Sequence, residues 1–120
     1  MTNSIFREYD IRGRYPGEIN EDIFFNLARA YAQVFKPKKI AIGRDSRLSS
    51  DILFLYLASG FAREKVKVVD LGQATTPFCL WYSQCFKPDT LVVTASHNPK
   101  DQNGLKIFSA KKGIMDAGYG

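Results

Sequence analysis

The sequence predicts an α/β fold with a largely parallel sheet, and three observations support this prediction. Its 120 residues, 45% of them hydrophobic and 24% charged, are enough for one domain with a packed core. Short apolar runs alternate with longer segments whose apolar residues recur at helical spacing, which is the order of βαβ units. No linker, low-complexity tract or internal repeat divides the chain, so we treat residues 1–120 as a single domain.

The first third of the chain predicts a strand followed by a helix. Residues 5–11 have the pattern of a short strand, which Gly13 and the Tyr-Pro-Gly turn signal at residues 15–17 are expected to end. Asn20 is a good N-cap for a helix that Pro37 stops, and two acidic residues follow the cap in the first turn. The apolar face of this helix is expected to consist of Ile23, Leu27, Tyr31 and Val34.

Further strands are expected after Pro37, each a short apolar run between polar segments. The last of these runs, at residues 105–108, could form a strand that pairs antiparallel at an edge of the sheet. The other three strands are predicted over residues 39–43, 67–71 and 90–94.

Two helices are expected between these strands. Ser49 or Ser50 can cap the first, which runs to about residue 64. Thr76 can cap the second, with Pro77 at its first helical position. The first of the two is apolar on nearly every side and needs cover all round. Either it lies deep between layers, or part of it faces a domain that this chain lacks.

The two cysteines are predicted to be free thiols. Cys79 and Cys85 are six residues apart, which places them on different faces of a helix. This spacing fits neither a disulfide framework nor a metal-binding knuckle, so we expect both thiols to be buried.

Charge and hydropathy argue against several classes of protein. The 17 Lys and Arg residues against 12 Asp and Glu give a net charge of +5, but the basic residues are scattered over the ends of the expected elements. No basic stretch is interleaved with aromatic residues, so we expect a small anionic ligand and no nucleic acid. The longest apolar run, residues 52–62, is too short to cross a membrane, and no secretory signal fits at the N-terminus. We therefore expect no membrane partner and a cytoplasmic location.

The loops that follow the strands are the places to look for a site, because ligands of open α/β sheets bind outside the carboxyl ends of the strands. These loops carry Arg, Ser, His and Asn residues, which together would form an anion site suited to phosphate. Ser96 stands out, because an apolar strand delivers its hydroxyl into a polar loop closed by Pro99. Such a hydroxyl either carries an acyl or phosphoryl group or merely caps a turn.

Lys106 is a second candidate for chemistry. Asn103 and Gly104 resemble a turn that would fold the chain back and bring the amine close to Ser96, although most lysines are simply solvated. The sequence has neither an acidic D-x-D-x-D cluster nor a G-x-x-x-x-G-K-[ST] phosphate loop. A phosphoryl-transfer enzyme with its metal site wholly inside this chain is therefore not expected.

Five short motifs follow one another along these loops. They are E-Y-D-I-R-G at residues 8–13, G-R-D-S-R at 43–47, T-T-P at 75–77, T-A-S-H-N-P at 94–99 and N-G-x-K at 103–106. In this order, over roughly residues 5–109, they resemble the first domain of the α-D-phosphohexomutases, the phosphomannomutase and phosphoglucomutase family. The resemblance implies a three-layer α/β/α sandwich with a mainly parallel mixed sheet.

The resemblance also implies roles for individual residues. Ser96 would carry the phosphoryl group, and Lys106 would be the general acid/base beside it. Arg44, Asp45 and Arg47 would contact the ligand or only brace their loop. The residues expected to contact phosphate or sugar are Tyr9, Arg12, His97 and Asn98.

The implied reaction interconverts hexose 1-phosphate and hexose 6-phosphate through a hexose 1,6-bisphosphate, so the partner is a phosphorylated hexose. Mg²⁺ would bind through the phosphate on Ser96, with its remaining ligands on another domain. The family builds its enzyme from four domains, so the chain resembles a fragment that packs against missing domains and is inactive alone. The sequence does not encode which hexose is preferred. The alternatives are a non-catalytic anion-binding or interaction module with the same fold, and nucleic-acid binding through the basic surface.

Overall fold

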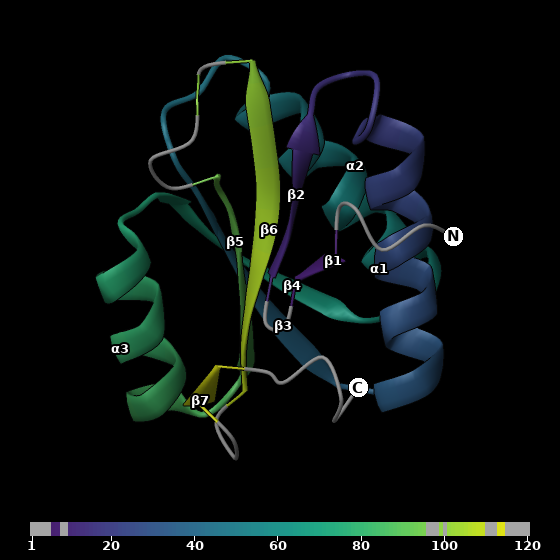
Figure 1. Ribbon diagram of the computed structural model, residues 1–120. Helices are drawn as coiled ribbons and strands as arrows, with labels where there is room; N and C mark the ends of the chain where they lie inside the picture. The colour runs from purple at the N-terminus through teal and green to yellow at the C-terminus, as the bar shows by residue number, and fades with distance from the viewer. Residues whose placement is uncertain (1–5, 8–9, 96–98, 100, 110–112, 115–120) are drawn as a thin grey trace.

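The chain folds into three layers, as a computed structural model that describes residues 6–7, 10–95, 99, 101–109 and 113–114 shows. A sheet forms the middle layer (Figure 1), with α1 (Glu21–Phe35) and α2 (Ser50–Arg63) on one face and α3 (Thr76–Phe86) on the other. The larger apolar cluster lies between the sheet and α1 and α2, and a smaller one lies under α3. The three-layer α/β/α sandwich is therefore confirmed.

One mixed sheet contains all the strands in the described part of the chain. They are β1 (Phe6–Arg7), β2 (Asp10–Arg14), β3 (Lys39–Arg44), β4 (Lys67–Gln73), β5 (Asp89–Val93), β6 (Gln102–Ser109) and β7 (Gly113–Ile114). The order is β1-β2-β6-β5-β3-β4, and β7 pairs with β6. The β3–β4 and β3–β5 pairs are parallel, and the other pairs are antiparallel.

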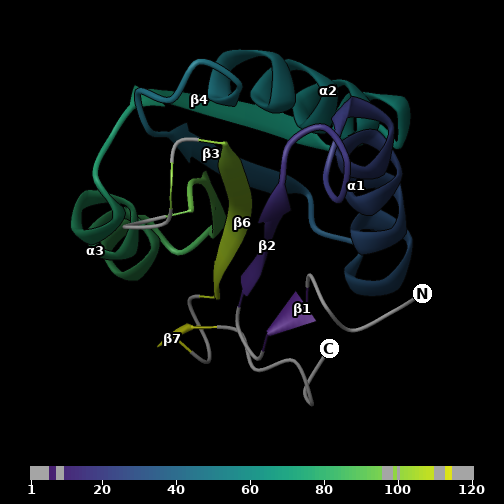
Figure 2. The same cartoon turned by 45° about the horizontal axis from the view of Figure 1, so that its top comes forward.

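β6 lies inside the sheet, between β2 and β5, and runs antiparallel to both (Figure 2). The prediction of an edge strand at residues 105–108 is therefore wrong. The reason is that β6 has apolar contacts on both faces. Leu105 and Ile107 join the cluster under α1 and α2, whereas Phe108 joins the cluster under α3. The parallel part of the sheet is consequently confined to β3, β4 and β5.

Asn103 and Gly104 lie within β6, so the turn predicted at these two residues is also wrong. The chain reverses earlier, where the Gln102 N–H donates to the Pro99 carbonyl at 3.0 Å. A Cβ at Gly104 would lie 2.1 Å from the carbonyl oxygen of Ile11. Glycine is needed here because β2 approaches β6 closely, and not because the chain turns.

The first strand also differs from its prediction. Two strands, β1 and β2, lie where one was expected over residues 5–11. Gly13 does not end the strand, because the pairing with β6 continues through Gly13 opposite Asn103 to Arg14 opposite Gln102. The turn follows at residues 15–18.

α1 begins as predicted, and Ile23, Leu27 and Tyr31 of its predicted apolar face pack in or against the core. The Asn20 side chain accepts a hydrogen bond from the Ile23 N–H at 3.1 Å, and the helix ends at Phe35, two residues before Pro37. Val34 is 66% exposed, so its place on the buried face is wrong. The close contact with α2 sets the rotation of α1, since a Cβ at Gly60 would lie 2.4 Å from a carbonyl of α1. The residues that α1 buries are Phe24, Ala28, Tyr31 and Ala32.

α2 is covered on one side only in the part of the chain that the structure describes. Leu53, Leu57 and Phe61 are fully buried, whereas Leu55 is 54% and Tyr56 is 40% exposed. Of the two alternatives, the one in which this helix lies deep between layers is therefore wrong, and the one in which part of it faces another domain stays a prediction. Ser49 precedes the helix, but its side chain makes no cap hydrogen bond within α2.

α3 is capped one residue earlier than predicted. The side chain of Thr75, and not that of Thr76, accepts a hydrogen bond from the Phe78 N–H at 3.2 Å. Both cysteines lie on this helix and are free, but only Cys79 is buried, so the predicted burial of Cys85 is wrong. None of the described helices combines the length and the apolar character needed to cross a membrane.

Candidate active site

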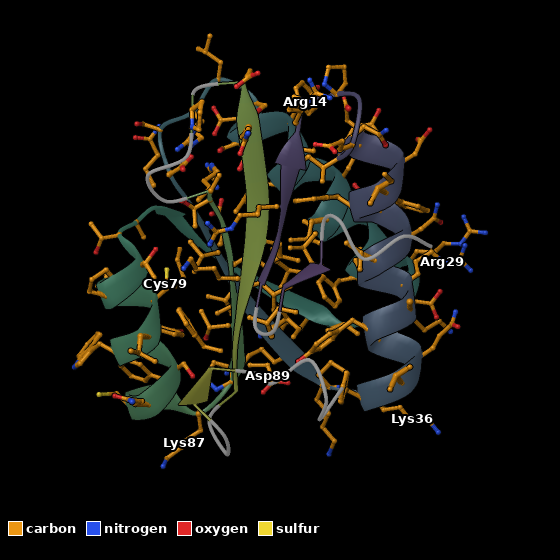
Figure 3. The ribbon with its side chains drawn as sticks, in the orientation of Figure 1. Arg14, Arg29, Lys36, Cys79, Lys87 and Asp89 are labelled. Atoms are coloured by element: carbon orange, nitrogen blue, oxygen red, sulfur yellow. The ribbon has the colours of Figure 1, made fainter. Side chains whose placement is uncertain are left out.

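The loops that were predicted to carry function meet at one end of the sheet. The Asp45 N–H, after β3, donates to the carbonyl of Val93 at the end of β5 at 3.1 Å. The Tyr15 N–H, after β2, donates to the carbonyl of Asp101 just before β6 at 2.9 Å. Figure 3 shows Arg14, the last residue of β2, at this end of the molecule. Backbone hydrogen bonds therefore connect the segments that follow β2, β3 and β5.

Arg12 and Lys106 share one face of the sheet. Arg12 pairs with Gly104, and Lys106 pairs with Val92 on β5. Because side chains alternate along a strand, Lys106 lies on the same face as Phe108, which is the face of α3. Arg12 is its diagonal neighbour, about 7–8 Å away between Cα atoms. Both side chains are partly buried, so this face carries two adjacent cations.

Lys106 lies beside the strand that leads to Ser96. Val92, its partner on β5, precedes Ser96 by four residues. The Thr94 N–H donates to the Gly104 carbonyl at 3.0 Å and extends the pairing beyond the end of β5. The chain therefore returns beside the strand that precedes Ser96, although not through a turn at the Asn-Gly pair. The predicted proximity of Lys106 to Ser96 itself stays a prediction, because Ser96 lies outside the described residues.

A buried polar network joins the start of α2 to the start of β6. The Asn103 amide donates to the hydroxyl oxygen of Ser50 at 2.9 Å and to that of Ser49 at 2.7 Å, and its own oxygen accepts from the Gly104 N–H. The Ser50 hydroxyl donates to Asp45 Oδ1 at 2.5 Å. Ser50 and Asn103 are fully buried, and these bonds satisfy polar groups that would otherwise destabilise the fold. Ser49 does not cap α2 because its backbone is already helical, with φ −79° and ψ −12°, whereas an N-cap residue is normally extended.

Arg47 extends this network to the loop after β5. Its Nε donates to Asp45 Oδ2 at 3.1 Å, and its Nη1 donates to the carbonyls of Pro99 at 2.8 Å and Gln102 at 3.2 Å. The Arg47 side chain is only 15% exposed. Of the two roles open for Asp45 and Arg47, these contacts favour the bracing of a loop.

Arg44 lies on the opposite face of the sheet from Arg12. Its guanidinium donates to Asp51 at 2.7 Å and to Asp70 at 2.9 Å, and it lies over the ring of Phe54 at 4.3 Å from the centroid. Partial burial lowers the pKa of Arg44, but the hydrogen bonds to the two carboxylates outweigh it and raise the pKa above its usual value. Arg44 therefore stabilises the contact between α2 and the sheet and is not part of the group formed by Arg12 and Lys106.

Comparison with known proteins decides the family. The sequence model described as "Phosphoglucomutase/phosphomannomutase, alpha/beta/alpha domain I" matches residues 3–116. The chain belongs to this family. The phosphomannomutase of Salmonella montevideo is 45% identical over 103 residues, which cover 85% of this chain and 23% of that protein. The phosphomannomutase of Klebsiella pneumoniae is 41% identical over the same share of this chain and 66% of its own length.

A solved structure of the phosphoglucomutase/phosphomannomutase family has the same fold. The crystal structure of a family protein from Burkholderia thailandensis superposes with a TM-score of 0.78 at 31% identity, covering 92% of this chain and 27% of that one. The chain thus spans about a quarter of the length of this protein and of the Salmonella relative.

Four of the predicted site residues of this family member lie outside the described residues. They are Tyr9, Ser96, His97 and Asn98. Of the predicted residues that are described, Arg12 and Lys106 come together. No group of three or more His, Cys, Asp or Glu side chains that could hold a metal ion occurs within the described residues.

The sequence did not reveal what Asn103 and Ser50 contribute to this phosphohexomutase fold. Asn103 stands in a family motif, but its proximity to Gly104 favoured a turn. Ser50 was considered only as a helix cap. The one available signal was a polar residue at each position next to an apolar run, and that signal does not identify a partner more than 50 residues away. The carbonyl acceptors at Pro99 and Gln102 have no sequence signal, because every residue carries one.

Proposed function

We propose that this chain is the phosphoserine-bearing domain of a phosphomannomutase/phosphoglucomutase, in which Ser96 transfers a phosphoryl group to and from a phosphorylated hexose. The observation that carries this proposal is the position of Lys106, which β6 sets beside the strand that leads to Ser96. Arg12 on the same face adds a second cation for the phosphate. Membership of the family supports the choice of this reaction over other uses of an anion site.

The proposed chemistry is a phosphoryl transfer in two directions. A hydroxyl oxygen of the hexose monophosphate attacks the phosphorus on Ser96, so that a P–O bond to the sugar forms while the P–O bond to Ser96 breaks. The sugar hydroxyl loses a proton and the serine oxygen gains one, and Lys106 is the proposed acid/base for this exchange. The resulting hexose 1,6-bisphosphate then returns its other phosphoryl group to Ser96. The net result is an isomerisation of the sugar phosphate.

Further ligand contacts are proposed from the family motifs. Tyr9, Arg12, His97 and Asn98 would contact the phosphate or the sugar. Mg²⁺ is proposed for the full-length enzyme, with the Ser96 phosphate as the ligand from this chain. The described residues do not by themselves fit a magnesium site, so the other ligands would come from outside them. The cytoplasmic location also stays a prediction.

The role of Ser96 can be tested in the full-length protein, expressed from the complete reading frame around this chain. We expect Ser96→Ala to abolish measurable turnover of mannose 1-phosphate and glucose 1-phosphate. By intact-mass analysis, phosphatase should remove one phosphate from the parent protein and none from the Ser96→Ala variant. Ser59→Ala is the matched control, because Ser59 is exposed on α2 and its hydroxyl donates to the Leu55 carbonyl of the same helix at 2.7 Å. Normal turnover by Ser96→Ala would overturn the proposal.

The second candidate is a non-catalytic module that binds an anion with the same cations. Arg12 and Lys106 favour it as much as they favour catalysis, so Ser96 decides between the two. A binding module would retain its affinity for a hexose phosphate after Ser96→Ala and would never carry phosphate on that residue. The main proposal also includes that the chain is one domain of a larger enzyme. We propose that it has no mutase activity alone, because phosphoryl transfer depends on charge stabilisation from several groups.

A further inference from the structure

Arg47 spans two segments that are far apart in the sequence. It lies in the loop between β3 and α2, and its Nη1 reaches the carbonyls of Pro99 and Gln102, which are 52 and 55 residues away. These two carbonyls mark the ends of the turn in which the Gln102 N–H donates to Pro99. One guanidinium therefore fixes the turn that directly follows the Ser96 segment.

The guanidinium is itself held in place. Asp45 accepts from Arg47 Nε at 3.1 Å and from the Arg47 backbone N–H at 3.0 Å. Asp45 is fixed in turn by the hydroxyl of Ser50, which is fully buried and bound to Asn103. The orientation of Arg47 thus depends on a chain of hydrogen bonds anchored in α2 and β6.

The same loop also holds the other end of the Ser96 segment. The Asp45 backbone N–H donates to the carbonyl of Val93, three residues before Ser96, and the Thr94 N–H donates to the carbonyl of Gly104. The chain is therefore fixed on the near side at Val93 and Thr94, and on the far side at Pro99. The contact with Arg47 is the link by which the loop after β3 fixes the far side.

We infer that Arg47 is a positioning residue for Ser96, acting through the turn at residues 99–102. This inference rests on the proposed function of Ser96. The position demands arginine, because a planar guanidinium can donate to a carboxylate and to two carbonyls at once in fixed directions. Lysine keeps the charge, but its single ammonium group does not reproduce this fork. A phosphoryl donor that is displaced by about 1 Å loses roughly a hundredfold in rate.

The test compares Arg47→Lys with Arg44→Lys in the full-length protein. Both substitutions remove a guanidinium that is bound to two or more partners beside α2, but Arg44 has its partners on Asp51 and Asp70 and not on the turn. We expect Arg47→Lys to lower kcat by roughly 10- to 100-fold with KM changed less than about threefold. Arg44→Lys should lower Tm while keeping kcat within about twofold of the parent.

Hydrogen–deuterium exchange of the peptide that contains residues 94–102 provides a readout that does not need activity. Arg47→Lys should increase exchange in this peptide several-fold and leave α1 unchanged, whereas Arg44→Lys should not affect the peptide. An unchanged kcat, unchanged exchange in this peptide, or an equal loss of kcat in both variants would overturn the inference. If Ser96→Ala remains fully active, the proposed function fails instead, and the exchange experiment still decides whether Arg47 holds the turn.

Discussion

At the scale of single residues, Gly104 determines how closely β2 can approach β6. A Cβ at this position would meet backbone atoms of β2, at 2.1 Å from the Ile11 oxygen and 2.9 Å from the Arg12 Cα. Backbone cannot move aside as a flexible side chain can, so Gly104→Ala should separate the two strands. We expect a loss of about 1–3 kcal/mol or more in the free energy of unfolding, measured by urea denaturation.

Gly17→Ala is the control for this substitution. Gly17 is exposed, and a Cβ there would meet no atom within 4 Å, so its free energy of unfolding should change by less than about 0.5 kcal/mol. Equal stability of the two variants would show that β2 and β6 are not packed as closely as described. Because Arg12 is directly opposite Gly104, the same close approach sets the distance between Arg12 and Lys106.

At the scale of elements, the N-cap of α3 is one residue earlier in the structure than the sequence predicts. The hydroxyl of Thr75 accepts from the Phe78 N–H, whereas Thr76 is the first residue of the helix. Thr75→Ala should therefore lower the free energy of unfolding by about 1 kcal/mol, because one amide at the helix start loses its acceptor. Thr76→Ala should change it by less than half as much. The reverse order in urea denaturation would favour the original prediction.

Local signals predicted the elements whose ends are fixed by local contacts. Asn20, the acidic first turn and Pro37 gave the bounds of α1 because a cap bonds to an amide three residues away. The signals failed where a distant segment decides. Val34 fits the apolar spacing of α1, but contact with Gly60 of α2 turns the helix so that Val34 is exposed. Asn103 and Gly104 have turn chemistry, but pairing with β2 and β5 makes them part of a strand.

At the scale of the whole molecule, the sequence predicted at which end of the sheet the site lies. It did not predict which side chains contact one another there. The rule that ligands bind at the carboxyl ends of strands selected the loops that hydrogen bonds join. It did not separate Arg12 from Arg44, because the two faces of the sheet become distinct only when the strand register is known. The predicted fold is therefore confirmed in its layers, whereas the predicted roles of the arginines needed the structure.

Because α3 packs against the sheet and buries Cys79, the free energy of unfolding of the whole molecule is expected to fall at alkaline pH. Cys79 lies between α3 and the sheet (Figure 3), and a Cβ at Gly43 of β3 would lie 2.6 Å from its sulfur. Burial raises the pKa of this thiol from 9.0 to about 11. In the unfolded chain the thiol ionises near its ordinary pKa, while in the folded protein it stays neutral. Its contribution to stability is therefore complete below pH 9 and is lost as the pH rises to 11.

The free energy of unfolding should fall by about 2 kcal/mol between pH 9 and pH 11 on account of this thiol. Urea denaturation at several pH values in this range measures the fall. Cys79→Ala should be less stable at pH 7.5 because it leaves a cavity, but its stability should depend less on pH. Some dependence should remain, since burial and the hydrogen bond to Glu21 also raise the pKa of Tyr15. Equal pH dependence in both proteins would mean that α3 does not bury the thiol, because only exclusion from water keeps Cys79 neutral in the folded state.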